Sequence, residues 1–126
     1  MKRAHLICFS CLLAAGSMLV LAGPDTKTGV VMDAACGARV AANAEKTAKH
    51  TVACALMESC KASGFGLILE GRFLKFDPAG DEQALKLLEA AKVRENFRAE
   101  VTGEFSEDDI KVSAMKAAKR EGSATK

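Results

Sequence analysis

The stretch from residue 33 to residue 64 constrains the fold of this chain most strongly, because it holds three of the five cysteines and one of the two histidines. A fold that brings these side chains together supports different chemistry from one that keeps them apart. Five residues of the stretch are candidates for a functional site: Cys36, His50, Cys54, Met57 and Cys60.

Residues 47 to 62 predict a single helix. Good helix formers are common there, Pro is absent, and Gly64 stands where a helix would end. Four side chains follow the spacing of one buried helical face: Ala53, Leu56, Met57 and Cys60. We therefore expect Cys60 to point toward the core.

The same helix would limit the disulfide bonds. His50, Cys54 and Met57 would form a row of nitrogen, thiol and thioether along it. Cys54 and Cys60 would be separated by about 9 Å of rise, whereas a disulfide needs Cα atoms within roughly 7 Å. If the helix is unbroken, Cys36 must pair with one of them and leave the other thiol free.

The first 22 residues predict a secretory signal peptide. Basic residues precede an apolar run that ends in small residues, which suits cleavage between Ala22 and Gly23. An uncleaved membrane anchor is the alternative. Cleavage would remove Cys8 and Cys11, so their C-x-x-C spacing is not interpreted as a redox motif. We expect an exported protein, periplasmic or secreted, with no membrane span after cleavage.

Removal of this peptide also removes the net positive charge. The whole chain has 18 basic and 16 acidic residues, and Lys2 and Arg3 account for the difference. A neutral chain without Trp or Tyr makes nucleic acid an unlikely partner. The length predicts one small domain, residues 23–115, followed by a polar tail at 116–126.

The rest of the chain predicts strands and one further helix. A helix capped by Asp77 or Asp81 would end near Lys92 and bury Ala84 and Leu88 on one stripe. Residues 38–49 would form a short helix or an ordered excursion. Alternating or β-branched patterns predict five strands: 28–33, 65–69, 72–77, 97–105 and 110–114.

This order of elements predicts a mainly β protein with helices, of the α+β class. Five strands, with a helix between the third and the fourth, match a five-stranded OB-like barrel. The cysteine-bearing stretch would be a helical insertion after strand 1. A meander sheet packed on two helices is the alternative, and neither fold determines the function.

The chain resembles a group of small secreted bacterial proteins of unknown function. The resemblance runs from Gly29 to about Met115 and is carried by G-V-V-M-D-x-x-C-G, H-T-V-A-C-A-L-M-E-S-C-K-A-S-G-F-G, G-R-F-L-K-F-D and V-T-G-E-F. It is specific around the Cys and His residues and generic in the strands. It implies an OB-like barrel, a cysteine-bearing insertion and export, and it implies no activity.

Three hypotheses account for the cysteines. In the first, a disulfide from Cys36 to Cys54 or Cys60 staples a binding or interaction module and contributes about 3 kcal/mol. In the second, zinc binds to the Cys₃His set of Cys36, His50, Cys54 and Cys60, or copper binds to His, Cys and Met ligands that include Met57. The third is thiol redox chemistry, with a leftover thiol beside His50. The leftover thiol could instead join two chains in a disulfide-linked dimer.

Catalytic motifs are absent from the sequence. It contains no G-x-S-x-G, Walker or H-E-x-x-H motif, so no enzyme activity is predicted. The acidic residues 107–109 supply too few ligands for calcium. The first hypothesis predicts no cofactor, and its partner would be an unidentified protein or small molecule.

Overall fold

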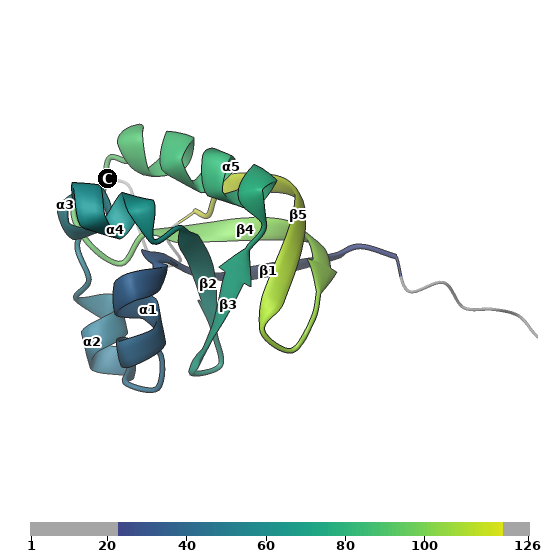
Figure 1. Ribbon diagram of the computed structural model, residues 1–126, viewed down its shortest axis with the longest axis horizontal. Coiled ribbons are helices and arrows are strands. Elements are labelled where there is room, and N and C mark those ends of the chain that lie inside the picture. Colours follow the sequence, from purple (N-terminus) through teal and green to yellow (C-terminus); the bar gives the residue numbers. More distant parts are fainter. Residues whose placement is uncertain (1–22, 120–126) are drawn as a thin grey trace, which may run out of the picture.

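The computed structural model describes residues 23–119. The expected signal peptide, with Ala22, and residues 120–126 of the polar tail lie outside this range. Figure 1 shows the arrangement of the elements. The strands are β1 (Asp25–Asp33), β2 (Phe65–Leu69), β3 (Arg72–Phe76), β4 (Arg98–Phe105) and β5 (Asp109–Ala117). The helices are α1 (Ala34–Val40), α2 (Ala44–Ala48), α3 (Val52–Ala55), α4 (Glu58–Ala62) and α5 (Pro78–Glu89).

The five strands follow one another around a closed ring in the order β1-β2-β3-β5-β4, and β4 pairs with β1. Neighbouring strands are antiparallel except β3 and β5, which are parallel. β1 takes part in two ladders, because residues 25–30 pair with β4 and residues 30–33 pair with β2. The prediction of an α+β protein with a five-stranded sheet is confirmed. The meander alternative is wrong, because β3 pairs with β5 and not with β4.

Apolar side chains from all the strands form the core. Leu67, Val101 and Ile110 are at most 1% exposed, and they come from β2, β4 and β5. Val31 of β1 and Phe76 of β3 complete the same cluster. The alternating pattern of β4 therefore faces the core as the sequence predicts.

Helix α5 follows β3 and precedes β4 in the sequence, which confirms the predicted position of a helix in the chain. It packs on this core. Asp77 is its N-cap, and its Oδ1 accepts hydrogen bonds from the N–H groups of Gly80 (3.0 Å) and Val112 (3.1 Å). Ala84 and Leu88 are buried as expected. The cap therefore fixes the start of the helix to β5 as well as to its own first turn.

The single helix predicted for residues 47–62 is wrong. Three short helices replace it, and Met57, with φ −63° and ψ 145°, breaks the chain between α3 and α4. The cause is long-range pairing, because the Val52 N–H donates to Arg94 O and the Asn96 N–H donates to His50 O. These bonds hold the backbone beside the segment before β4 and end the helical path at His50.

The predicted buried face of that helix is accordingly wrong in part. Cys60 is buried and Leu56 is half-buried, but Ala53 is exposed and the Met57 side chain is 56% exposed. The break at Met57 turns the helix axis, so residues on the two sides of it no longer share one stripe. Cys60 lies on α4, the helix that starts after the break, and its side chain is still buried.

Helices α1 and α2 form the remainder of the insertion after β1. Gly37 lies within α1 and is buried against the ring of Phe73. A Cβ at this position would overlap that ring, so glycine is required for close approach rather than for a turn. The insertion is thus packed directly against β3.

The last strand is longer than expected. β5 continues to Ala117, and the Ala118 N–H donates to Arg98 O, so the sheet extends past residue 115. No helix within residues 23–119 is long and apolar enough to cross a membrane.

Candidate metal centre

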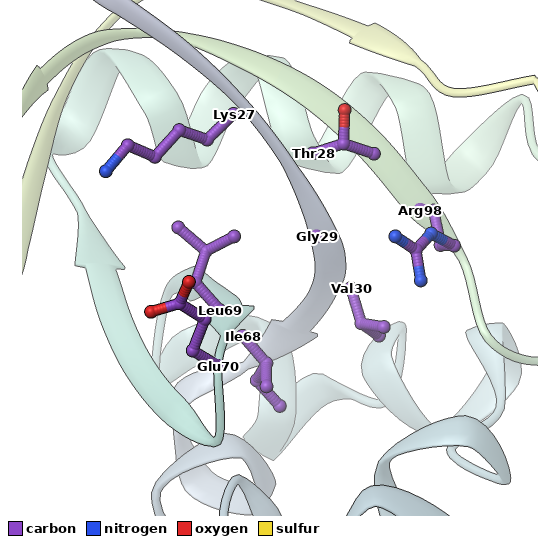
Figure 2. A pocket seen from close by; sticks show the side chains of 8 residues that line it. All are labelled: Lys27, Thr28, Gly29, Val30, Ile68, Leu69, Glu70 and Arg98. Carbon is purple, nitrogen blue, oxygen red and sulfur yellow. The ribbon is translucent and has the colours of Figure 1, made fainter.

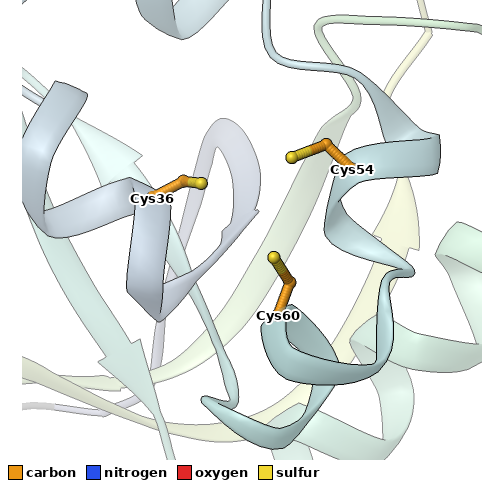
Figure 3. A group of neighbouring side chains, drawn as sticks. All are labelled: Cys36, Cys54 and Cys60. Carbon is orange, nitrogen blue, oxygen red and sulfur yellow. The ribbon is translucent and has the colours of Figure 1, made fainter.

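Three cysteine side chains converge between the helices of the insertion. Cys36 comes from α1, Cys54 from α3 and Cys60 from α4, and Figure 3 shows their sulfurs pointing toward one another. The three Sγ atoms all lie within 4.8 Å of one another. All three are free thiols, and no pair lies at bonding distance. The expected disulfide at Cys36 is therefore not formed in this structure.

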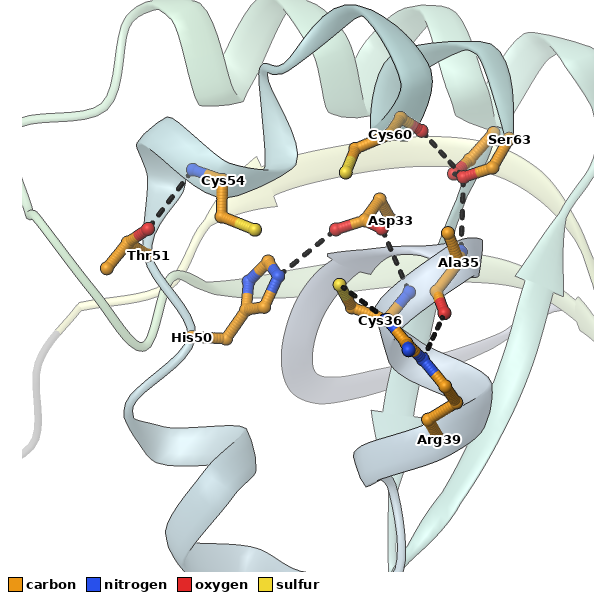
Figure 4. Close-up of polar contacts among 10 residues, drawn as sticks. Asp33, Ala35, Cys36, Arg39, His50, Thr51, Cys54, Cys60 and Ser63 are labelled. Carbon is orange, nitrogen blue, oxygen red and sulfur yellow. Dashed lines mark hydrogen bonds and ion pairs between the residues drawn. The ribbon is translucent and has the colours of Figure 1, made fainter.

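Asp33 lies next to the thiols and is fully buried, with 0% exposure. It is the last residue of β1 and the N-cap of α1, where its Oδ2 accepts a hydrogen bond from the Cys36 N–H at 3.0 Å. Its Oδ1 lies 3.1 Å from Nε2 of His50, whose side chain is 10% exposed (Figure 4). Although these two atoms are close, neither makes an aligned hydrogen bond, and both are buried.

The donor atoms form two overlapping groups. Cys36, Cys54 and Cys60 make one, and Asp33, Cys36 and His50 make the other. Within each group all donor atoms lie within 4.8 Å of one another. Cys36 belongs to both, so its sulfur occupies the centre of a five-residue cluster that could hold a metal ion.

Local hydrogen bonds position these side chains. The Thr51 hydroxyl oxygen accepts from the Cys54 N–H at 3.1 Å and caps α3. The Ser63 hydroxyl donates to Cys60 O at 2.6 Å and accepts from the Ala35 N–H at 3.1 Å. Ser63 thus joins the end of α4 to the start of α1 and holds two cysteine-bearing helices together.

The ionisation of the site reflects its burial. Burial lowers the pKa of His50, and the nearby carboxyl of Asp33 opposes this in part. Burial raises the pKa of Cys54 to about 11, with further contributions from Cys36, Cys60 and Asp33. The pKa of Cys60 is also raised, by burial first and then by Asp33 and Cys36. Without a cation, the site therefore favours a neutral imidazole and protonated thiols at Cys54 and Cys60.

Most of the residues expected at a site do come together. Cys36, Cys54 and Cys60 are neighbours, and His50 is close to Cys36. His50 and Cys54 do not share a helix turn, because His50 precedes α3. Met57 was expected in the donor row, but its side chain is exposed and the residue separates the two helices.

Asp33 is the site residue that the sequence analysis missed. The signal was present, because a carboxylate directly after an apolar strand and three residues before a cysteine has the spacing of a helix cap. Such a cap would have placed Asp33 beside Cys36.

Comparisons with protein-family models, with curated proteins and with solved structures found no match for this chain.

A hollow of about 480 Å³ lies away from this cluster, beside β1 where that strand passes from β4 to β2. Its charged side chains are Lys27, Glu70 and Arg98. In Figure 2, Lys27 and Arg98 extend to different sides of β1. The charges therefore do not converge on one point, and the thiol cluster is the stronger candidate for chemistry.

Proposed function

We propose that this chain is a zinc-binding protein and that Cys36, Cys54 and Cys60 hold the ion. The observation that carries the proposal is the convergence of three unlinked sulfurs from three different helices within 4.8 Å of one another. Thiolates are preferred ligands of zinc, with Zn–S distances of about 2.3 Å. Only small side-chain movements are needed to bring the sulfurs onto one ion.

The composition of the cluster favours zinc over copper(I). Thiolates suit both metals, but the carboxylate of Asp33 and the imidazole of His50 suit a divalent, borderline-soft ion. Burial, and in addition the negative charge of Asp33, disfavour ionisation of Cys54 and Cys60, and a bound divalent cation would favour it. Copper(I) is the competing metal, and the test below distinguishes the two.

The remaining parts of the proposal concern fold type and location. The strand order, the parallel β3–β5 pair and the helix before β4 support an OB-like barrel with a metal-binding insertion. The basic and apolar N-terminal sequence supports export, and the resemblance to small secreted bacterial proteins agrees with it. In an oxidising compartment, a bound metal would protect the thiols from oxidation.

A disulfide-stapled interaction module is the second candidate. The proximity of the three sulfurs favours it, because oxidation of two neighbouring thiols would give a staple. Thiol redox catalysis is less well supported, since a reactive cysteine has a lowered pKa whereas those of Cys54 and Cys60 are raised. We propose no enzyme activity.

Native mass spectrometry of the protein purified without reductant tests the proposal. Cys8 and Cys11 are first replaced by Ser, so that any metal must bind to the other three cysteines. We expect zinc to be retained, and to be lost in Cys36→Ser but not in the control Met57→Leu, because Cys36 belongs to both donor groups and Met57 is exposed. A metal-free protein lighter by two hydrogen atoms would support the staple and refute zinc binding. Preferential retention of copper(I) in competition with zinc would change the metal assignment.

A further inference from the structure

We propose that the centre binds two divalent metal ions that share the thiolate of Cys36. One ion would be held by Cys36, Cys54 and Cys60, and the other by Asp33, Cys36 and His50. This inference rests on the proposed zinc function and extends it, because that function requires only one ion.

The arrangement of donors carries the inference. Each of the two groups has three donor atoms within 4.8 Å of one another, and the groups meet at the Cys36 sulfur. Two sulfurs on one tetrahedral zinc ion lie about 3.8 Å apart, given Zn–S distances of about 2.3 Å. Each group is therefore within about 1 Å of the spacing that an ion requires. A thiolate has more than one lone pair, so its sulfur can ligate two ions.

An independent observation shows that the second group suits a cation. Asp33 Oδ1 and His50 Nε2 are buried and lie 3.1 Å apart, yet neither makes an aligned hydrogen bond. Nitrogen and oxygen ligands of one tetrahedral zinc ion lie about 3.4 Å apart, given bonds of about 2.1 Å. Buried polar atoms are rarely left without a partner. Two such atoms at this separation fit ligands that face one ion.

The other oxygen of Asp33 fits the same role. Oδ2 accepts the hydrogen bond from the Cys36 N–H at 3.0 Å, whereas Oδ1 faces Nε2 of His50 at 3.1 Å without an aligned hydrogen bond. Metal-ligating carboxylates are commonly oriented by a hydrogen bond of this kind. This one hydrogen bond, which caps α1, therefore positions two of the proposed ligands, the carboxylate of Asp33 and Cys36.

Charge also favours two ions. With all ligands ionised, Asp33 and the three thiolates carry four negative charges, and one divalent ion would leave two of them uncompensated. Arg39 donates to the Cys36 sulfur at 3.9 Å, but it is exposed to solvent and compensates only weakly. Uncompensated charge beside the fully buried Asp33 is costly. Two divalent ions would compensate all four negative charges of the ligands.

Zinc titration followed by native mass spectrometry measures the number of ions, again with Cys8 and Cys11 replaced by Ser. We expect two zinc ions per chain and one in His50→Gln, which removes a ligand from the second group only. Cys54→Ser should also bind one ion, held by the second group. Cys36→Ser should bind neither ion tightly, because it removes the shared ligand. Met57→Leu is the control and should bind two.

Cobalt(II) provides a second measurement that does not depend on mass. Its paramagnetic resonance signal should grow with the first equivalent and decrease with the second, because the shared sulfur couples the two spins. Asp33→Asn keeps a helix-capping side chain, so it tests the second group if His50→Gln fails to fold. We expect one cobalt ion in that variant and no decrease of the signal.

The outcomes separate the two proposals. If the parent protein and His50→Gln both bind one zinc ion, the two-ion proposal is wrong and the zinc function stands. Two ions that both persist in Cys36→Ser, or two cobalt ions without spin coupling, would refute the shared thiolate. If no metal binds in any form, both proposals fail.

Discussion

Replacement of Asp33 by Asn should stabilise the metal-free protein while weakening its metal site. Asn and Asp are equally good N-caps, so the hydrogen bond from the Cys36 N–H is kept. The amide NH₂ group would replace Oδ1, which faces Nε2 of His50 without an aligned hydrogen bond, and it can donate to that nitrogen, since burial lowers the pKa of His50 and favours the neutral ring. One added hydrogen bond contributes about 1 kcal/mol, and a buried unsatisfied group costs about 1–3 kcal/mol. The cap bond to a neutral amide is weaker than that to a carboxylate by about 1 kcal/mol, so we expect the free energy of unfolding to rise by about 1–3 kcal/mol in total.

Urea denaturation in the presence of a chelator measures this change, with the slope compared to confirm that the denatured state is the same. Asp77→Asn is the matched control, because Asp77 also caps a helix but already accepts two hydrogen bonds. The control should lose about 1 kcal/mol, since hydrogen bonds to a charged oxygen are stronger than those to an amide. Equal destabilisation by the two replacements would refute the reasoning, because it would mean that Asp33 is already well paired.

With zinc added, the parent protein should become more stable than Asp33→Asn, the reverse of the order expected without metal. A ligand at about 100 times its dissociation constant stabilises a protein by about 2.7 kcal/mol. The parent protein should gain more from zinc than Asp33→Asn does, because the variant lacks one ligand. If both gain equally, Asp33 is not a metal ligand.

The other predictions concern packing and pH. Gly37→Ala should destabilise the protein by about 1–3 kcal/mol in urea denaturation, because the new Cβ would overlap the ring of Phe73; unchanged stability would show that the ring can move away. Leu88→Ala should cost about 2–5 kcal/mol by the same assay and leave the zinc stoichiometry intact, because Leu88 is 1% exposed in α5, which supplies no ligand. The pKa of Cys54 is raised from 9.0 to about 11, so its contribution to metal-free stability is present below pH 9 and is lost as the pH rises toward 11. Denaturation midpoints measured across that range should fall in the parent and fall less in Cys54→Ser.

The strands could be predicted from the sequence because their signal is local. Side chains that alternate along β4 face the core and the solvent in turn, and the two strands of the β2–β3 hairpin lie where the pattern puts them. The start of α5 was predictable to within one turn, because Asp77 and Asp81 were both candidate caps; the structure has Asp77 as the N-cap and Pro78 as the first residue of the helix. These features depend on neighbours a few residues apart.

The geometry of the site was less predictable because it depends on distant residues. The bond from the Val52 N–H to Arg94 O helps to break the predicted helix, and no pattern within residues 47–62 reveals it. The limit on pairing Cys54 with Cys60 assumed an unbroken helix, and the break at Met57 removes that assumption. The candidate cysteines were recognised, but their common meeting point follows from the tertiary fold.

The insertion leaves and rejoins the sheet at one rung, where Asp33 pairs with Phe65. The Ala34 N–H donates to Gly64 O and closes the base of the insertion. In topological terms, residues 34–64 are one long hairpin loop between β1 and β2. The entropy of closing a loop grows only with the logarithm of its length, so the sheet tolerates changes in the length of this loop. Residues could therefore be inserted in or deleted from the insertion while the register of the strands is preserved, which would alter the proposed metal centre without altering the sheet.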